Sequence, residues 1–313
     1  SVASRGLGDV YKRQGLIWLL LVLLLHGLGW QRLRVAELRG VSSDPMERRV
    51  LVLQPAIPTR RKFDLDQQLG LLRQLERAMA QAQRLGIDAL LLPEGALPLG
   101  QALSMPAPVE VLSGGFRLEQ DQLRSALLAF PKGSEEPAVA LDKHRLVPLG
   151  EWIPGAGLMR WAGLSAVGGV SPGAPSRLMQ LPDGALAVAI CYELADGQAL
   201  AEAARQGAGW VLASANLDPY PAQLQRQFSA LAQLRAIETG RWLVSSANTG
   251  PSLAVDPAGL VRSALMPGRS GTLAAQLQLR SDLTTYARWG EAPLAALAAA
   301  GIFVSIRSKV RQS

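Results

Sequence analysis

Short apolar runs alternate with amphipathic stretches from residue 50 to residue 285. Apolar runs bounded by Gly, Pro or Asp predict strands, and amphipathic stretches predict helices. The expected strands are 50–53, 89–92, 109–113, 125–130, 177–181, 185–190, 210–214, 242–246, 252–255 and 272–279, and the expected helices are 64–85, 196–206 and 222–238. Because fully apolar strands are buried on both faces, the pattern predicts one α/β domain in which helices cover the sheet.

Two of the expected helices have an apolar face that should pack on the core. In helix 64–85 this face consists of Leu65, Leu69, Leu72, Leu75 and Met79. In helix 222–238 it consists of Leu224, Phe228, Leu231 and Ile237, and Arg226, Gln233 and Arg235 are expected outside it. Asp64 is the expected N-cap of the first helix, and Gly86 is the residue expected to end it.

Two longer apolar runs lie near the ends of the chain. Residues 15–30 predict a short or partial transmembrane helix rather than a cleaved signal peptide, because no small-residue cleavage site follows them. Residues 292–306 predict a C-terminal transmembrane helix, since the basic cluster of 307–311 follows directly; an Ala-rich core helix is the alternative. Residues 1–14 show neither periodicity nor membrane character and are expected to be a non-native leader.

The net charge of +7 by itself suggests a nucleic-acid partner. However, residues 50–285 contain 20 Lys+Arg and 20 Asp+Glu, so the excess lies at the two ends, beside the apolar runs. This distribution favours a membrane partner and no nucleic acid. The single cysteine excludes a disulfide framework, and the two distant histidines offer a metal little to bind. With no phosphate-binding or dinucleotide-binding motif present, we expect no metal and no cofactor.

Three polar residues stand directly after an apolar strand or in a loop rich in Pro and Gly: Glu94, Lys143 and Cys191. Functional groups of α/β folds gather at the carboxyl ends of strands. Taken singly, each residue has an ordinary structural explanation, as a solvated turn, a surface lysine and a small buried side chain. Together they fit nucleophilic catalysis, in which the thiol needs a base, Glu94 accepts its proton and Lys143 stabilises an oxyanion.

The loops near these residues leave further roles open. Glu151 follows Lys143 in the same loop, where it either orients the lysine or the incoming amine or forms an ordinary salt bridge. His144 is assigned no catalytic role. The Gly-rich stretch 163–176 and the Pro-bounded stretch 217–221 are the expected movable covers of the site, because both adjoin strands that lead to it.

The order and the flanks of these residues resemble the nitrilase (carbon–nitrogen hydrolase) superfamily, and within it the apolipoprotein N-acyltransferases. The resemblance covers about residues 50–306 and rests on VLQPAIP, LLLPEGALP, DKHRLVPLGEWIP, AICYE, QLRAIETGRWLVSSANTG and TTYARWGEAPL. It implies a four-layer α-β-β-α nitrilase-like sandwich flanked by membrane helices, with the catalytic domain 50–285 on the periplasmic side of the cytoplasmic membrane. The family has several membrane helices before this domain, so the sequence looks truncated.

The resemblance also implies roles for individual residues. It implies Glu94 as general base, Lys143 as the oxyanion-stabilising lysine, Cys191 as nucleophile, Glu151 as a further essential glutamate, and Tyr192 and Glu193 as supports of the site. The stretch SANLDPYP departs from the family, which usually has Asn-Asp and a Trp there, so the substrate contacts of 216–221 stay open.

The implied activity is that of a monomeric membrane enzyme. It moves an acyl chain from a phospholipid, through a thioester on Cys191, to the N-terminal amine of diacylglyceryl-cysteine lipoproteins. One alternative is a carbon–nitrogen hydrolase (amidase) of the same superfamily, with water as the acceptor. The other is a catalytically inactive, membrane-tethered binding domain.

Overall fold

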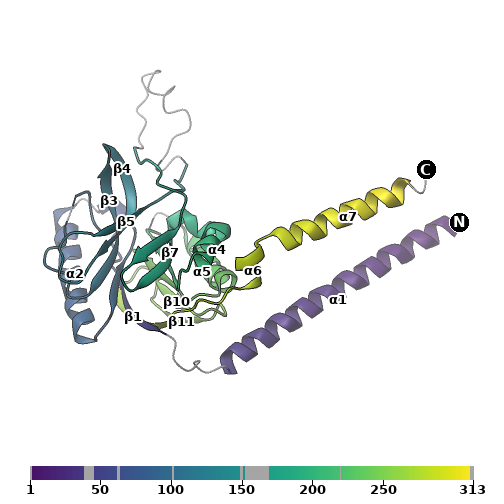
Figure 1. Cartoon of the computed structure of the whole chain (residues 1–313), viewed down its shortest axis with the longest axis horizontal. Helices are drawn as coiled ribbons and strands as arrows, with labels where there is room; N and C mark the ends of the chain where they lie inside the picture. Colours follow the sequence, from purple (N-terminus) through teal and green to yellow (C-terminus); the bar gives the residue numbers. More distant parts are fainter. Residues whose placement is uncertain are drawn as a thin grey trace, which may run out of the picture. The chain divides into compact units, whose positions relative to one another are not determined.

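The computed structural model describes residues 2–38, 46–61, 64–100, 102–148, 151, 169–218 and 220–310, which belong to two compact units, 1–45 and 46–313. The described residues of the first unit form one helix, α1 (Val2–Leu38), shown in purple in Figure 1. Within α1, the 18 residues Gln14–Gln31 have a mean hydropathy of 1.4 and none of them is buried. By length and composition, this segment is able to cross a membrane.

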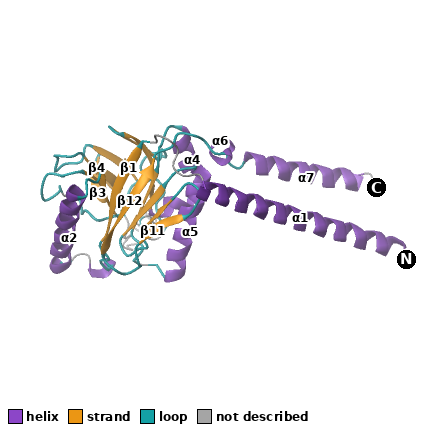
Figure 2. Ribbon diagram, turned by 90° about the horizontal axis from the view of Figure 1, so that it is seen from below, coloured by secondary structure: helices purple, strands orange, loops and turns teal. Residues whose placement is uncertain are grey.

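The second unit is built on two mixed six-stranded sheets (Figures 1 and 2). The first sheet has the order β12-β1-β2-β3-β4-β5. Its strands are β1 (Glu47–Gln54), β2 (Ala89–Leu92), β3 (Glu110–Glu119), β4 (Gln122–Phe130), β5 (Val139–Asp142) and β12 (Gly271–Gln278). The central strands β1, β2 and β3 run parallel, and the other pairs are antiparallel.

The second sheet has the order β11-β10-β9-β8-β7-β6. Its strands are β6 (Leu178–Leu181), β7 (Gly184–Ile190), β8 (Val211–Ala215), β9 (Leu243–Ala247), β10 (Leu253–Val255) and β11 (Val261–Ala264). Here β7, β8 and β9 run parallel, and the remaining pairs are antiparallel. Parallel strands therefore form the middle of both sheets, and their carboxyl ends are available for a functional site.

The two sheets pack face to face, and helices cover their outer faces (Figure 2). The core between the sheets combines side chains such as Val52 and Leu91 from one sheet with Val188 and Leu212 from the other. Helix α2 (Leu65–Arg84) packs on the first sheet, and α4 (Gly197–Arg205) and α5 (Ala222–Thr239) pack on the second. The predicted α-β-β-α sandwich is confirmed.

Two 3₁₀ turns and two further helices complete the described part of the second unit. These are the 3₁₀ turns η1 (Thr59–Arg61) and η2 (Cys191–Ala195) and the helices α6 (Thr285–Trp289) and α7 (Ala292–Val310). The side chains of α7 are exposed as far as residue 301. Helix α7 includes residues 307–310 of the predicted basic flank, whereas Arg311 lies outside the described residues. The transmembrane character predicted for 292–306 from this flank stays a prediction.

Helix α5 differs from its expected orientation. Arg235, expected outside, is 7% exposed, whereas Ile237, expected on the core face, is 49% exposed. The cause lies in Gly197 at the start of α4, because a Cβ atom there would come within 1.6 Å of the Arg235 guanidinium. The space left by this glycine admits the guanidinium, which also pairs with Glu238.

Helix α2 has the predicted apolar face, but the core covers only part of it. Leu75 and Met79 are buried, whereas Leu65 is 69% exposed and Leu69 is 43% exposed. Asp64 stands at the N-cap position without capping the helix through its side chain. This carboxylate instead accepts a 3.1 Å hydrogen bond from Arg61. Gly86 follows the last turn with φ +60°, the left-handed conformation expected of a glycine that ends a helix.

Candidate active site

Five polar residues follow strands at the carboxyl edges of the two sheets. Glu94 comes after β2, Lys143 after β5, Cys191 after β7, Asn216 after β8 and Asn248 after β9. The structure thus places the three predicted residues at the carboxyl ends of strands, where functional groups of α/β folds commonly lie. The two asparagines were not predicted from the sequence.

Lys143 lies between two carboxylates. Its side chain is 1% exposed, and its Nζ donates to Glu94 Oε1 at 2.9 Å and to Glu151 Oε1 at 2.7 Å. The second oxygen of each carboxylate accepts from the backbone, Glu94 Oε2 from Asn216 N at 3.1 Å and Glu151 Oε2 from Val147 N at 2.9 Å. Both carboxylates are therefore held by two hydrogen bonds each.

The charge state of Lys143 follows from these neighbours. Burial disfavours its ammonium form, but Glu94, Cys191 and Glu151 outweigh burial and raise the pKa of Lys143 above its ordinary value. The lysine is therefore a fixed positive charge at neutral pH. Glu151, for which the sequence allows either an orienting role or an ordinary salt bridge, contacts the lysine directly.

Cys191 begins the 3₁₀ turn η2 and is 6% exposed. Its backbone has φ +52°, a conformation that L residues seldom adopt and that is often found at functional sites. On one side it packs in an apolar cluster with Ala215, Leu217 and Ala247. Burial and the charge of Glu94 raise the pKa of the Cys191 thiol to about 12, and Lys143 opposes this rise only in part. The thiol is consequently protonated at neutral pH and needs a base when it attacks.

The raised thiol pKa predicts a distinctive pH dependence of alkylation. The thiolate is the reacting form, so the rate of Cys191 modification by iodoacetamide should rise about tenfold per pH unit up to roughly pH 11. Free cysteine, the control, should approach a plateau near its pKa of about 8.5. Glu94 carries a negative charge that raises the thiol pKa. In Glu94→Gln this charge is absent, so the alkylation rate of Cys191 should reach its plateau at a lower pH. A plateau below about pH 9 in the unmodified protein would contradict this electrostatic account.

Glu193 is buried and connects three segments of the site. Arg177 Nη1 donates to both of its carboxylate oxygens at 2.8 Å, and the side chains of this pair are 1% and 3% exposed. Glu193 also accepts from the backbone N–H of Ile190 at 2.9 Å, of His144 at 2.7 Å and of Arg145 at 3.1 Å. It therefore joins the turn that bears Cys191 to the loop that bears Lys143.

The structure describes Tyr192 and parts of the two stretches that are expected to cover the site. Tyr192 is 52% exposed. In the stretch 163–176, residues 163–168 lie outside the described residues, and Gly173 N donates to Lys143 O at 2.8 Å. In 217–221, residue 219 is likewise outside the described residues, whereas Leu217 and Tyr220 pack in the apolar cluster around Cys191. A covering function of either stretch stays a prediction.

A glycine on the neighbouring strand allows the Glu94 turn to lie close to the sheet. A Cβ atom on Gly114 in β3 would be 2.4 Å from Glu94 Cα and 2.6 Å from Pro93 O. No real Cβ atom approaches backbone so closely, so a larger residue would displace the turn. Among the residues that the structure describes, no group of three or more His, Cys, Asp or Glu is arranged to hold a metal ion.

The sandwich, with a glutamate, a lysine and a cysteine at its strand ends, defines the class of protein. Residues 124–287 match the family model described as carbon-nitrogen hydrolase, and this match covers more than half of the chain. The chain belongs to the carbon-nitrogen hydrolase family.

Within that family, the chain is similar to proteins named apolipoprotein N-acyltransferase. The one from Prochlorococcus marinus (strain MIT 9313) is 50% identical over 285 residues, which are 91% of this chain and 56% of that protein. The one from Parasynechococcus marenigrum (strain WH8102) is 50% identical over 294 residues, which are 90% of this chain and 60% of that protein. The chain therefore spans little more than half the length of these curated relatives.

Solved structures share the fold at low sequence identity. Nit3 of Saccharomyces cerevisiae, a member of the nitrilase superfamily, superposes with a TM-score of 0.55 at 15% identity. The superposition covers 74% of this chain and 90% of the Nit3 chain. A mutant amidase from Nesterenkonia AN1 superposes with a TM-score of 0.56 at 18% identity and covers 82% of this chain and 99% of its own. These likenesses concern the fold alone.

Proposed function

We propose that this chain contains the catalytic domain of a membrane-bound N-acyltransferase. It transfers an acyl chain from a phospholipid, through a thioester on Cys191, to the N-terminal amine of a diacylglyceryl-cysteine lipoprotein. The observation that carries the proposal is a protonated thiol in apolar surroundings beside an ammonium held between two carboxylates. The similarity to relatives named apolipoprotein N-acyltransferase supports the choice of substrates.

In the first half-reaction, Sγ of Cys191 attacks the carbonyl carbon of the phospholipid ester, and Glu94 takes the thiol proton. The carbonyl oxygen becomes an oxyanion, which the Lys143 ammonium stabilises in a site of low dielectric. When the tetrahedral intermediate collapses, the ester C–O bond breaks. Glu94 returns the proton to the departing alkoxide, so a lysophospholipid leaves and a thioester remains on Cys191.

In the second half-reaction, the lipoprotein amine attacks the thioester carbonyl carbon and Glu94 accepts an amine proton. The C–S bond breaks, an amide forms and the proton returns to the thiolate of Cys191. Glu151 keeps Lys143 in place through both steps. Water must stay away from the thioester until the amine arrives, and the apolar neighbours Ala215, Leu217 and Ala247 support such exclusion.

The proposed location is the cytoplasmic membrane, with the catalytic domain on its outer side and the chain acting as a monomer. Support comes from the apolar segment Gln14–Gln31 in α1 and from the apolar stretch Ala292–Gly301 of α7. Basic residues at 307–311 favour a cytoplasmic C-terminus. This placement brings the site to the membrane from which the donor comes.

The fate of the acyl-enzyme tests the proposal. Given phospholipid but no acceptor, the protein should accumulate a long-chain acyl adduct on Cys191, because no amine is present to discharge it. Intact-mass analysis should detect this adduct, hydroxylamine should remove it and a diacylated lipopeptide should discharge it as the triacylated product. Cys191→Ala should form no adduct, and Glu94→Gln should form it slowly.

Two outcomes would contradict the proposal in different ways. Rapid release of free fatty acid without lipopeptide would make water the acceptor and assign the chain to the hydrolases. Absence of any adduct under conditions in which iodoacetamide still reaches Cys191 would favour an inactive binding domain.

A further inference from the structure

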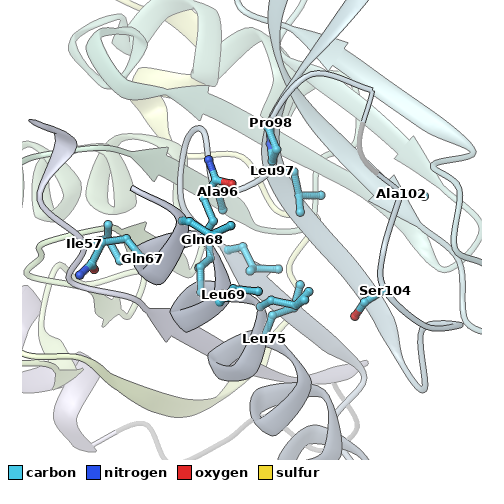
Figure 3. A pocket seen from close by; sticks show the side chains of 14 residues that line it. Ile57, Gln67, Gln68, Leu69, Leu75, Ala96, Leu97, Pro98, Ala102 and Ser104 are labelled. Atoms are coloured by element: carbon cyan, nitrogen blue, oxygen red, sulfur yellow. The ribbon is translucent and has the colours of Figure 1, made fainter. Parts of the chain in front are cut away.

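A cavity of about 280 Å³ opens between the N-terminal half of α2 and the segment that follows Glu94 (Figure 3). The residues that line it are Ile57, Leu65, Gln67, Gln68, Leu69, Leu71, Leu72, Leu75, Leu92, Ala96, Leu97, Pro98, Ala102 and Ser104. Eleven of these 14 described residues are apolar and none is charged. The cavity is close in size to the smaller ligand pockets of proteins, which occupy about 300–1,000 Å³.

This cavity adjoins a smaller one at the candidate active site. A second cavity of about 20 Å³ is lined by Glu94 and Asn216, and it shares Ile57, Leu71 and Ala96 with the larger one. The larger cavity therefore lies next to the small cavity that the proposed general base lines. A chain whose reacting end lies at Cys191 would reach the larger cavity by passing Glu94.

The rim of the cavity is apolar as well. Leu65 and Leu69, on the uncovered part of the α2 face, are 69% and 43% exposed. Exposed apolar side chains around an apolar cavity mark a surface that binds an apolar partner, since water gains few hydrogen bonds there.

We propose that this cavity binds the hydrocarbon part of the transferred acyl chain and thereby selects its length. The proposal rests on the proposed acyltransferase function, because it takes the occupant from the phospholipid donor. A lining without charges suits a hydrocarbon chain and disfavours a phosphate headgroup or a charged peptide, whose burial without partners would be costly. Gln67, Gln68 and Ser104 are the polar residues of the lining.

Photocrosslinking tests occupancy without requiring activity. The probe is a phosphatidylglycerol with a diazirine near the end of one acyl chain, mixed with the Cys191→Ala protein in phosphatidylglycerol vesicles. Irradiation should label peptides that contain residues 65–75 and 96–104. Excess unlabelled phosphatidylglycerol should compete with this labelling. Labelling confined to α1, α7 or other segments would overturn the proposal, whether or not the protein forms a thioester.

Donor chain length provides a second test with a matched control. Leu69→Trp fills the mouth of the cavity, whereas Leu85→Trp adds the same volume at a leucine of similar exposure, 51%, at the C-terminal end of α2 and outside the lining. Each methylene that remains unburied costs about fourfold in binding. Leu69→Trp should therefore lower thioester formation from a long-chain donor, relative to a short-chain donor, by roughly 10- to 100-fold.

The control should keep the long-to-short ratio of the unmodified protein. An unchanged ratio in Leu69→Trp, or an equal change in both variants, would overturn the assignment of this cavity. If the unmodified protein forms no thioester from any donor, the proposed function fails, and the crosslinking pattern alone then decides whether the cavity binds a lipid chain.

Discussion

Replacing Lys143 with methionine is expected to slow acylation of Cys191 by about 100- to 1,000-fold, the loss typical of one oxyanion donor. The fold should lose stability at the same time. Lys143 is 1% exposed, and its removal leaves Glu94 and Glu151 facing each other without the cation between them. Breaking a buried ion pair by removing one partner costs about 3–5 kcal/mol. Single-turnover mass spectrometry and urea unfolding measure the two effects separately.

A double variant separates catalysis from folding. In Lys143→Met/Glu151→Gln only one carboxylate remains, so part of the lost free energy of unfolding should return, while acylation should stay slow. Glu151→Gln alone serves as the matched control for the loss of that carboxylate. If the double variant acylated at close to the rate of this control per folded molecule, Lys143 would be a structural residue only.

The positions of Glu94, Lys143 and Cys191 were predictable from the sequence because each follows a strand with a clear apolar signal or lies in a loop next to one. The direction of the strands then brings the residues close together, because parallel central strands have their carboxyl ends at the same edge of a sheet. Asn216 and Asn248 follow strands in the same way. In the fold, the backbone N–H of Asn216 donates to Glu94, and the side-chain amide of Asn248 donates to Asn216 Oδ1 at 2.9 Å. Neither contact leaves a pattern in the sequence.

The strands β5 and β11 were not predicted, and both are edge strands of their sheets. The side chains of β11 (VRSA) are mostly exposed and form no apolar run. The short run of β5 (VALD) ends at a charged residue and is only partly buried. The burial of Arg235 was also unpredictable from helical periodicity. It depends on the missing side chain of Gly197, which is near Arg235 only in the folded protein.

In the N-terminal part of α2, the apolar pattern and the observed burial disagree. Periodicity correctly predicted that Leu65 and Leu69 belong to the same face as Leu75 and Met79, and it implied that the core buries all of them. The structure buries only the second pair. An apolar face that extends beyond the core is the feature that led to the proposed acyl-chain cavity, so the disagreement between pattern and burial is itself informative.

Replacing Glu193 with glutamine is expected to destabilise the fold about as strongly as the loss of Lys143. The neutral amide leaves the guanidinium of Arg177 without its counter-ion, although both side chains are almost fully buried. The expected cost is about 3–5 kcal/mol in the free energy of unfolding. In thermal unfolding each kcal/mol corresponds to about 2–4 °C for a domain of this size, so the midpoint should fall by roughly 10 °C.

An exposed ion pair of the same domain provides the control. Arg280 and Asp282 are 2.7 Å apart with side chains 43% and 61% exposed, so Asp282→Asn should cost less than about 1 kcal/mol. Glu193 also accepts the backbone N–H of His144 and Arg145, the two residues after Lys143, and the N–H of Ile190 just before Cys191. Acylation per folded molecule should therefore fall in Glu193→Gln and stay unchanged in Asp282→Asn. Equal stability of the two variants would show that the Glu193–Arg177 pair does not hold the lysine and cysteine segments together.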